Sequence, residues 1–487
     1  MSFRTRTATA DRPPQHLIRA SAVRNASMLT LATLTARASM FALGIVLARS
    51  LGAADYGRYS LALALGAVLQ PIADFGISVY LVRETARDRT AAEGALGRLA
   101  RVKVGLLVAA TALTVGGAAA FGTSPDLLLV VTVMVVAAML DGWSIFVYCY
   151  LQGRESMGVE ARTTAVAGIV RACGAIAIAL ATGDLRLVVA WVLAVAVVQA
   201  AVASRTLRRV VGRLASPRGA RVDWRSVASF GLIGISVVVY LRSDALLIAW
   251  FQDETAVGLY AAAYTLVLGV QVVPVVLTAA LLPIFARTHG DGTDGFTQTW
   301  HDGLRLLLLI TLPVSVLLCV LAGPIIQRAF GSEFAESADV LRIITWMSPL
   351  VAVSLAAQAV LKGSRREGTL LRVSLACVVF NVGINLWAIP AAGIKGAAAT
   401  SVATEAINAV ALLWYVVSRG LVPRPDLPLL RVGTAVALLT VVAALLADAP
   451  VELAAAAALA VYVGTLVATG VLRGEELAGL RRLTQAG

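Results

Sequence analysis

The stretch DLLLVVTVMVVAAMLDGWSIFVYCY, residues 126–150, is apolar over almost its whole length and carries only Asp141 as a charge in its interior. A membrane-spanning helix needs about 20 mainly apolar residues, so this stretch predicts one. About fourteen such segments follow one another along the chain: 27–49, 58–82, 103–122, 126–150, 163–182, 185–204, 227–250, 256–283, 304–322, 340–361, 372–390, 395–418, 431–448 and 452–472. Lipid leaves no partner for exposed backbone groups, so we expect an all-α polytopic membrane protein.

The composition agrees with this prediction. Of 487 residues, 59% are hydrophobic and 14% are charged, whereas soluble domains are about 45–50% apolar and about 25% charged. A soluble globular protein and a disordered chain are therefore both excluded. The net charge of +13 does not indicate nucleic-acid binding, because the basic residues sit in short loops between apolar runs.

The distribution of Lys and Arg predicts the topology. Most of the 41 basic residues lie in alternate loops, which the positive-inside rule assigns to the cytoplasm. These stretches are 1–26, 83–103, 154–162, 205–225, 287–305, 362–372, 419–431 and 473–482. The opposite loops hold only Arg49, Arg58, Arg186, Arg328 and Lys395. We therefore expect both termini in the cytoplasm, an even number of spans and contacts with anionic membrane lipids.

Motifs for covalent chemistry are absent from the sequence. The four Cys lie in apolar runs without metal-ligand spacing, and the three His lie in polar segments. No phosphate-binding GxxxxGK[ST] motif occurs. We therefore expect neither catalytic residues nor a metal or other cofactor, and a transporter is favoured over an enzyme.

An internal repeat is visible. Gly57, Tyr59 and Gln70 recur at one constant offset as Gly258, Tyr260 and Gln271, and LQGRESMGVEAR (151–162) recurs as LKGSRREGTLLR (361–372). These matches place the first, second and fifth spans on the seventh, eighth and eleventh. The halves would share one orientation, related by an axis along the membrane normal, with the transport site between them near the midplane.

The repeat predicts the domain organisation. We expect a basic cytoplasmic N-terminus (1–26), an N-lobe of six spans (27–204), a basic cytoplasmic linker (205–226), a C-lobe of six spans (227–418), two further spans (419–472) and a cytoplasmic tail (473–487).

Charged residues inside spans are the candidate site. A charge at the bilayer centre costs about 2.5–3.5 kcal/mol on insertion scales, so such residues usually face a bundle interior or a cavity. The charged residues of this kind are Arg37, Asp74, Asp141, Arg171, Arg242, Asp244, Arg342 and Glu405. Each could instead form a structural ion pair or reach the membrane surface. That alternative is strongest for Asp141, Arg342 and Glu405.

Arginine suits a phosphate-bearing substrate, because its planar fork binds two oxygens at once and stays charged. Arg37 and Arg242, with Arg171, are therefore the predicted diphosphate-binding residues. Gln70 and Gln271 join them as repeat-equivalent polar residues, and Tyr240 as part of a polar stripe with Asp244. Arg242 and Asp244 do not share a helix face, so Asp244 would pair across to another span.

Three stretches resemble a known family. LGAADYGRYSLALALGAVLQPIADFGISVYLVRETAR (51–87), VGLYAAAYTL (257–266) and FGSEFAESADVLRI (330–343) are similar to segments of bacterial polysaccharide-biosynthesis membrane proteins. These are the oligosaccharide-lipid flippases of the multidrug/oligosaccharidyl-lipid/polysaccharide exporter superfamily.

The resemblance implies a fold and a substrate. The fold would be two six-helix lobes in a V that open alternately to either side, here with two extra C-terminal helices. The substrate would be an undecaprenyl-diphosphate-linked glycan, moved to the outer leaflet of the bacterial plasma membrane. Glycan polymerase or glycosyltransferase machinery would be a partner. Relatives use cationic residues in the central cavity, which Arg37 and Arg242 match by span and charge.

Three functions remain open. In the first, a flippase moves a lipid-linked oligosaccharide, with Asp74 and Asp244 as gating or coupling carboxylates. In the second, the same fold exports drugs or other small molecules in exchange for a cation, and these carboxylates dominate. The third is a non-transporting scaffold for glycan polymerisation, which would have no need of charge at mid-membrane. The glycan, the oligomeric state and the energy source, whether proton, sodium ion or membrane potential, are not specified by the residues.

Overall fold

The described part of the chain is helical and contains no strand. The computed structural model describes residues 15–120, 122–212, 222–288, 294–364, 366–425 and 428–471. The helices are α1 (Gln15–Asp74), α2 (Ile77–Arg87), α3 (Arg89–Ala120), α4 (Pro125–Gly153), α5 (Met157–Thr182), α6 (Leu185–Val211), α7 (Trp224–Phe251), α8 (Glu254–Thr288), α9 (Asp294–Val320), α10 (Ala322–Ala329), α11 (Ser337–Ile344), α12 (Met347–Gly363), α13 (Glu367–Ser418), α14 (Leu429–Leu445) and α15 (Val451–Ala468), with one 3₁₀ turn, Ser332–Phe334.

Several expected spans are joined or bent in the structure. Gly52 (φ 79°) breaks α1 between the first two spans, and Gly393 (φ 61°) breaks α13 between the eleventh and twelfth. Both glycines have a positive φ, a backbone conformation that glycine adopts without strain. A 47° bend separates Ser39–Asp74 from α2. In the described residues nine helices are long and apolar enough to cross a membrane, or up to ten with this bent pair as one span.

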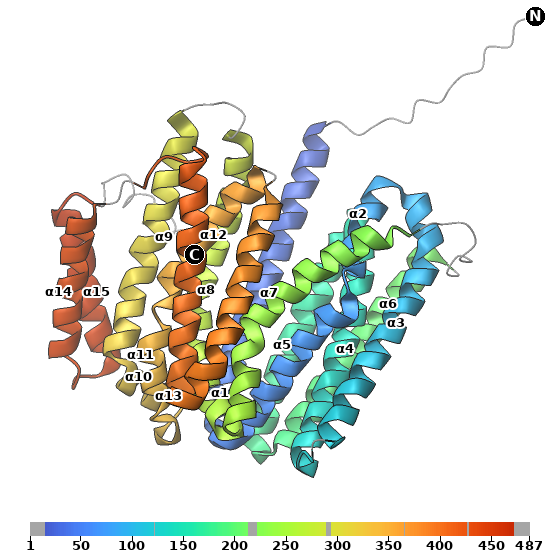
Figure 1. Ribbon diagram of the computed structural model, residues 1–487, viewed down its shortest axis with the longest axis horizontal. Helices are drawn as coiled ribbons and strands as arrows, with labels where there is room; N and C mark the ends of the chain where they lie inside the picture. The colour runs from blue at the N-terminus through green and yellow to red at the C-terminus, as the bar shows by residue number, and fades with distance from the viewer. Residues whose placement is uncertain are drawn as a thin grey trace, which may run out of the picture.

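The helices form the two expected lobes (Figure 1). The N-lobe contains α1–α6, in blue to green-blue, and the C-lobe contains α7–α13, in green to orange. Helices α14 and α15 pack against each other and on α9, at the far edge of the C-lobe. The predicted all-α fold, with two lobes and two appended helices, is confirmed. Helix α6 continues to Val211, so the expected linker begins as helix.

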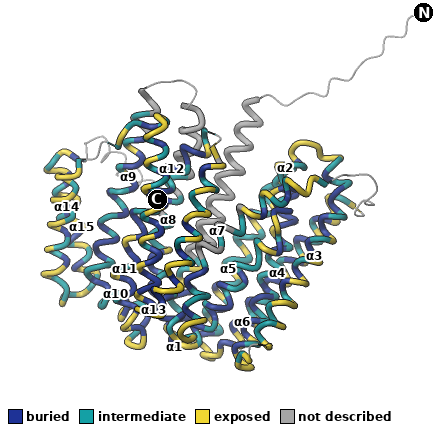
Figure 2. The backbone as a smooth tube through the Cα atoms, viewed as in Figure 1, coloured by how far each residue is buried: buried dark blue, intermediate teal, exposed yellow. Residues whose placement is uncertain are grey.

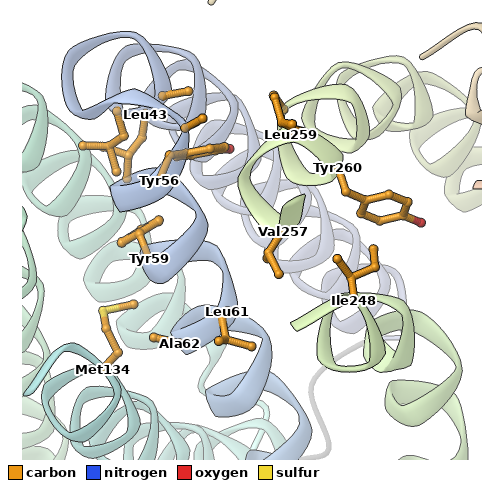
Figure 3. Close-up of a cluster of buried hydrophobic side chains, with 14 of the residues drawn as sticks. Leu43, Tyr56, Tyr59, Leu61, Ala62, Met134, Ile248, Val257, Leu259 and Tyr260 are labelled. Atoms are coloured by element: carbon orange, nitrogen blue, oxygen red, sulfur yellow. The ribbon is translucent and has the colours of Figure 1, made fainter. Parts of the chain in front are cut away.

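The two lobes meet tightly at one end of the molecule, which we call the closed end. Gly57 of α1 and Gly258 of α8, the glycines of the repeat, face each other so closely that a Cβ on either would clash with backbone of the other lobe. Figure 3 shows Tyr56 on one helix and Val257 and Leu259 on the facing one, all buried. A buried apolar cluster thus joins the lobes here.

Polar contacts reinforce the closed end. The Tyr56 hydroxyl lies 3.0 Å from the hydroxyl of Thr265. The Glu333 carboxylate accepts a 2.9 Å hydrogen bond from the backbone N–H of Ala53, which begins the second segment of α1 directly after Gly52. A C-lobe side chain therefore caps an N-lobe helix.

Helix α7 crosses from the C-lobe toward the N-lobe at the opposite end. It contacts α13, α1 and α2. The break between α1 and α2 touches it closely, because a Cβ on Gly76 (φ 81°) would lie 2.3 Å from the carbonyl oxygen of Val227. Asp223 caps α7 through hydrogen bonds from Ser226 and Arg225, which lower the pKa of its carboxyl.

Buried residues line the helix faces inside each lobe, whereas exposed residues lie on the outer faces (Figure 2).

Candidate functional site

Two adjoining cavities share part of their walls, one between the lobes and one mostly within the N-lobe. One, of about 410 Å³, is lined by α1, α7 and α8. The other, of about 460 Å³, lies between α1, α4, α5 and α6 and also reaches α7. Their common lining residues are Met40, Leu43, Tyr59, Leu63 and Arg242. The cavities therefore meet at Arg242.

Arg242 is the cation at this junction. It lies on α7 and is partly buried. Among the described residues it forms no hydrogen bond and no ion pair. Tyr264 lines the first cavity together with Arg242. An arginine without a partner inside a transmembrane bundle keeps its whole donor fork available for an anion.

Arg171 is at the second cavity, but its charge is balanced. Its two Nη atoms bind both carboxylate oxygens of Asp141, at 2.8 and 2.9 Å. Nη2 also lies 3.5 Å from the Gln199 Oε1, while the buried Nε has no hydrogen-bond partner in the described part of the chain. The structure thus brings Arg171 and Asp141 together in a bidentate ion pair, the structural alternative considered for such charges. Both side chains still line the cavity.

Asp244 lies in the wall of the first cavity and is buried, with 8% of its surface exposed. Asn385 donates to its Oδ1 at 2.7 Å, and the hydroxyls of Ser401 and Tyr260 donate to its Oδ2 at 2.5 and 3.0 Å. In the described part of the chain no cation forms an ion pair with it. As expected, Asp244 pairs with other spans and not with Arg242.

Asp74 is bound within the N-lobe. Its Oδ1 lies 2.7 Å from Lys103 Nζ and accepts a 2.5 Å hydrogen bond from the Ser78 hydroxyl. The Lys103 side chain is 1% exposed. Sequence reasoning placed Lys103 in a cytoplasmic loop and missed this pair, because an ion pair between distant residues leaves no local pattern. A lysine at the start of an apolar run was the only signal.

The other predicted residues are distributed differently. Gln70 lines the second cavity and donates to the Ala138 carbonyl oxygen at 3.3 Å. Gln271, its repeat partner, lines neither cavity, and its buried Nε2 has no hydrogen-bond partner among the described residues. The side chains of Arg37 and Tyr240 lie outside the described residues.

A second buried polar cluster in the C-lobe was only partly anticipated. Glu405, 3% exposed, accepts hydrogen bonds from Ser354 at 2.5 Å and Asn408 at 3.2 Å. Near the closed end, Arg342 pairs with Asp339, which Lys395 Nζ also approaches at 2.6 Å. Glu405 and Arg342 therefore have protein partners, which agrees with a structural role for these two residues.

Comparisons with known proteins agree with the geometry. A family model described as polysaccharide biosynthesis protein matches residues 22–289, and a second, MatE, matches residues 231–387. No curated protein sequence matches the chain.

Solved structures match over most of the chain. The lipid II flippase MurJ in an inward closed conformation has a TM-score of 0.72 at 12% identity, over 91% of this chain and 99% of that one. A multidrug resistance MATE family transporter in an inward-facing conformation has a TM-score of 0.61 at 15% identity, over 82% and 98%. A Pyrococcus furiosus transporter of the MOP superfamily has a TM-score of 0.55 at 15% identity, over 81% and 94%.

At these identities the structures establish the fold, which is that of multi-pass membrane transporters. The family model covers more than half of the chain, and its residues include the closed-end contacts of α1 and α8 and the arginine at the cavity junction. The chain belongs to the polysaccharide biosynthesis protein family.

Proposed function

We propose that this protein is a flippase for an undecaprenyl-diphosphate-linked oligosaccharide. It would move this lipid from the inner to the outer leaflet of the plasma membrane for cell-surface polysaccharide biosynthesis, by alternating access. The observation that carries the proposal is Arg242, which lines both central cavities and forms no hydrogen bond or ion pair among the described residues. A buried charge without a partner is destabilising, so a role in binding an anion accounts for its presence.

The predicted topology supports the direction of transport. Arg49, Arg58, Arg328 and Lys395, which we expect outside the cytoplasm, belong to the elements of the closed end. The structure would then be closed toward the outside, the state that receives a substrate from the cytoplasmic leaflet.

The arginines would have different roles. Arg242 would hold the diphosphate directly, since its guanidinium group has no hydrogen-bond or ion-pair partner among the described residues. Arg171 would contribute a weaker attraction, because Asp141 already occupies both of its Nη atoms. Arg37 stays a predicted diphosphate ligand on the first span. Asp74 and Asp244 stay the proposed gating and coupling carboxylates. The hydrogen-bond donors to Asp244 among the described residues are neutral, so a proton or a cation would bind it without displacing a charged partner.

The test measures the orientation of the lipid-linked intermediate. Lipids from a deletion strain are probed in intact spheroplasts with a membrane-impermeant sugar-modifying enzyme. We expect undecaprenyl-diphosphate-linked glycan to accumulate on the inner leaflet and to reach the outside again with the wild-type gene. Arg242→Gln should fail to restore this, whereas Arg186→Gln, which removes an exposed arginine paired with Asp126, should restore it. Full complementation by Arg242→Gln would remove Arg242 from the site.

A second function has one observation in its favour. Asp244 lines the same cavity as Arg242, and a buried carboxylate at a cavity wall suits the cation-coupled export of small molecules. That function predicts raised drug sensitivity in the deletion strain, no accumulated lipid-linked glycan, and a greater loss with Asp244→Asn than with Arg242→Gln. A scaffold function instead predicts that both variants complement fully.

A further inference from the structure

A third cavity, of about 380 Å³, lies between α5 and α6 of the N-lobe. Its walls are almost entirely aliphatic and include Val166, Val170 and Val198, whose exposed fractions are 60%, 41% and 62%. Both helices are candidate membrane spans. Exposed valines on spans face lipid chains, so the cavity is a groove that opens toward the bilayer. We call it the lateral groove.

The two ends of the lateral groove differ. At one end the Trp191 ring fills the space beside Gly174, where a Cβ would lie 2.1 Å from the ring. The indole N–H of Trp191 donates to the Val170 carbonyl oxygen at 3.2 Å, so α5 and α6 are joined here. At the other end lies Arg162, an exposed residue close to the start of α5, in a stretch we expect to be cytoplasmic.

The lateral groove adjoins the proposed substrate site at one side chain. Gln199 of α6 lines both the groove and the second central cavity. On the cavity side its Oε1 lies 3.5 Å from Arg171 Nη2. A polar amide therefore stands where an apolar, lipid-facing space meets a cavity with a cation.

We infer that the lateral groove receives the polyprenyl chain of the substrate while its diphosphate lies in the central cavity. This inference rests on the proposed function and adds a path for the tail through the N-lobe. A molecule with a long apolar chain joined to a diphosphate matches both sides of Gln199. An ordinary phospholipid does not, because its charged headgroup would stay at the membrane surface near Arg162 and leave the cavity side empty.

The groove also indicates the leaflet from which the chain enters. It extends from the Arg162 end and is closed by Trp191, so it spans only the half of the bilayer that we expect to face the cytoplasm. The chain would leave the groove when the diphosphate moves across, because the Trp191 contact blocks passage between α5 and α6 toward the other leaflet.

The first experiment locates the chain by photocrosslinking. A benzophenone amino acid replaces Val166 or, as a control, Val379, which is equally apolar, 74% exposed and on α13. Native membranes of the deletion strain, loaded with radiolabelled undecaprenyl-diphosphate-linked glycan, are irradiated. We expect label on the Val166 variant and background on the control. Equal labelling of both, or only phospholipid on the Val166 variant, overturns the inference.

The second experiment fills the groove. Val198→Trp should weaken the apparent affinity for the lipid-linked substrate by about tenfold, the equivalent of two methylene groups excluded from an apolar site, while Val379→Trp should have no effect. Val198→Met, a smaller change, should give an intermediate loss and guards against misfolding. If the wild type translocates the lipid and both groove variants match the control, the groove inference fails alone. If the wild type moves no lipid-linked glycan, the proposed function itself fails.

Discussion

The contact between Gly57 and Gly258 predicts how the lobes are held together at the closed end. In Gly57→Ala the new Cβ would lie 1.7 Å from the carbonyl oxygen of Glu254, and real Cβ contacts essentially never fall under 3.0 Å. Helices α1 and α8 would therefore have to separate by about 1.3 Å, the difference between these distances. The obstacle is backbone, so no side-chain rotation relieves it.

The magnitude follows from the cost of overpacking. Extra methyl groups in a well-packed interior destabilise by about 1–3 kcal/mol, which corresponds to about a 5–150-fold shift in a two-state equilibrium. The penalty applies only while the closed end is shut. Gly57→Ala should therefore populate a state open at this end. Gly258→Ala should act in the same way, because its Cβ would lie 2.0 Å from the Ala53 carbonyl oxygen.

The assay is double electron–electron resonance between spin labels on Ala54→Cys and Ser332→Cys, one exposed position on each lobe. We expect Gly57→Ala to add a longer-distance population. We also expect the double glycine variant to shift less than the sum of the single variants, because one separation relieves both clashes. Gly116→Ala is the matched control, since nothing lies within 4 Å of its Cβ. A wild-type distance distribution in Gly57→Ala would refute the reasoning.

Three further predictions concern individual polar side chains. Lys103→Met should destabilise the folded protein by about 3–5 kcal/mol, because it leaves Asp74 with an unpaired partly buried charge. Thermal unfolding in detergent measures this loss of stability. The double variant Lys103→Met with Asp74→Leu should recover part of it. Glu333→Gln should favour opening of the closed end by about 0.5–1 kcal/mol, because it removes the charge that caps Ala53, and the same spin-label pair reports it; an unchanged distribution would argue against a latch. Asp244→Asn should make transport independent of an imposed proton or sodium gradient, measured in proteoliposomes; retained gradient dependence would place the coupling elsewhere.

Much of the architecture was accessible from composition and periodicity. Apolar runs long enough to span a membrane predicted the helices, because a lipid environment forces every such run to satisfy its backbone internally. The recurrence of Gly57 and Tyr59 as Gly258 and Tyr260 predicted two halves of one orientation. Gly52 and Gly393 each form a kink between two consecutive spans that follow one another directly. Composition does not show such joints, because one left-handed residue is enough to turn the chain.

The candidate site was accessible as a set of charged residues but not as an arrangement. The sequence singled out both Arg242 and Arg171 as arginines inside apolar runs, and it favoured Arg242 because that residue lies in the first span of its half. In the structure Asp141 neutralises Arg171, while Arg242 at the junction of two cavities has no partner among the residues that the structure describes. The difference depends on which helices are neighbours, and no local pattern in the chain specifies that. Lys103 was assigned to a loop for the same reason.

The sequence by itself determined that this is a duplicated, all-helical membrane protein, because hydrophobic length and repeat spacing are properties of the chain alone. It also determined which residues carry charge into the bilayer. Only the tertiary structure decided which of those charges are satisfied. The energy of a buried charge depends on the groups within a few ångströms of it. For Asp244 those groups come from the next helix, α8, and from α13, which is 141 residues further along the chain at Asn385.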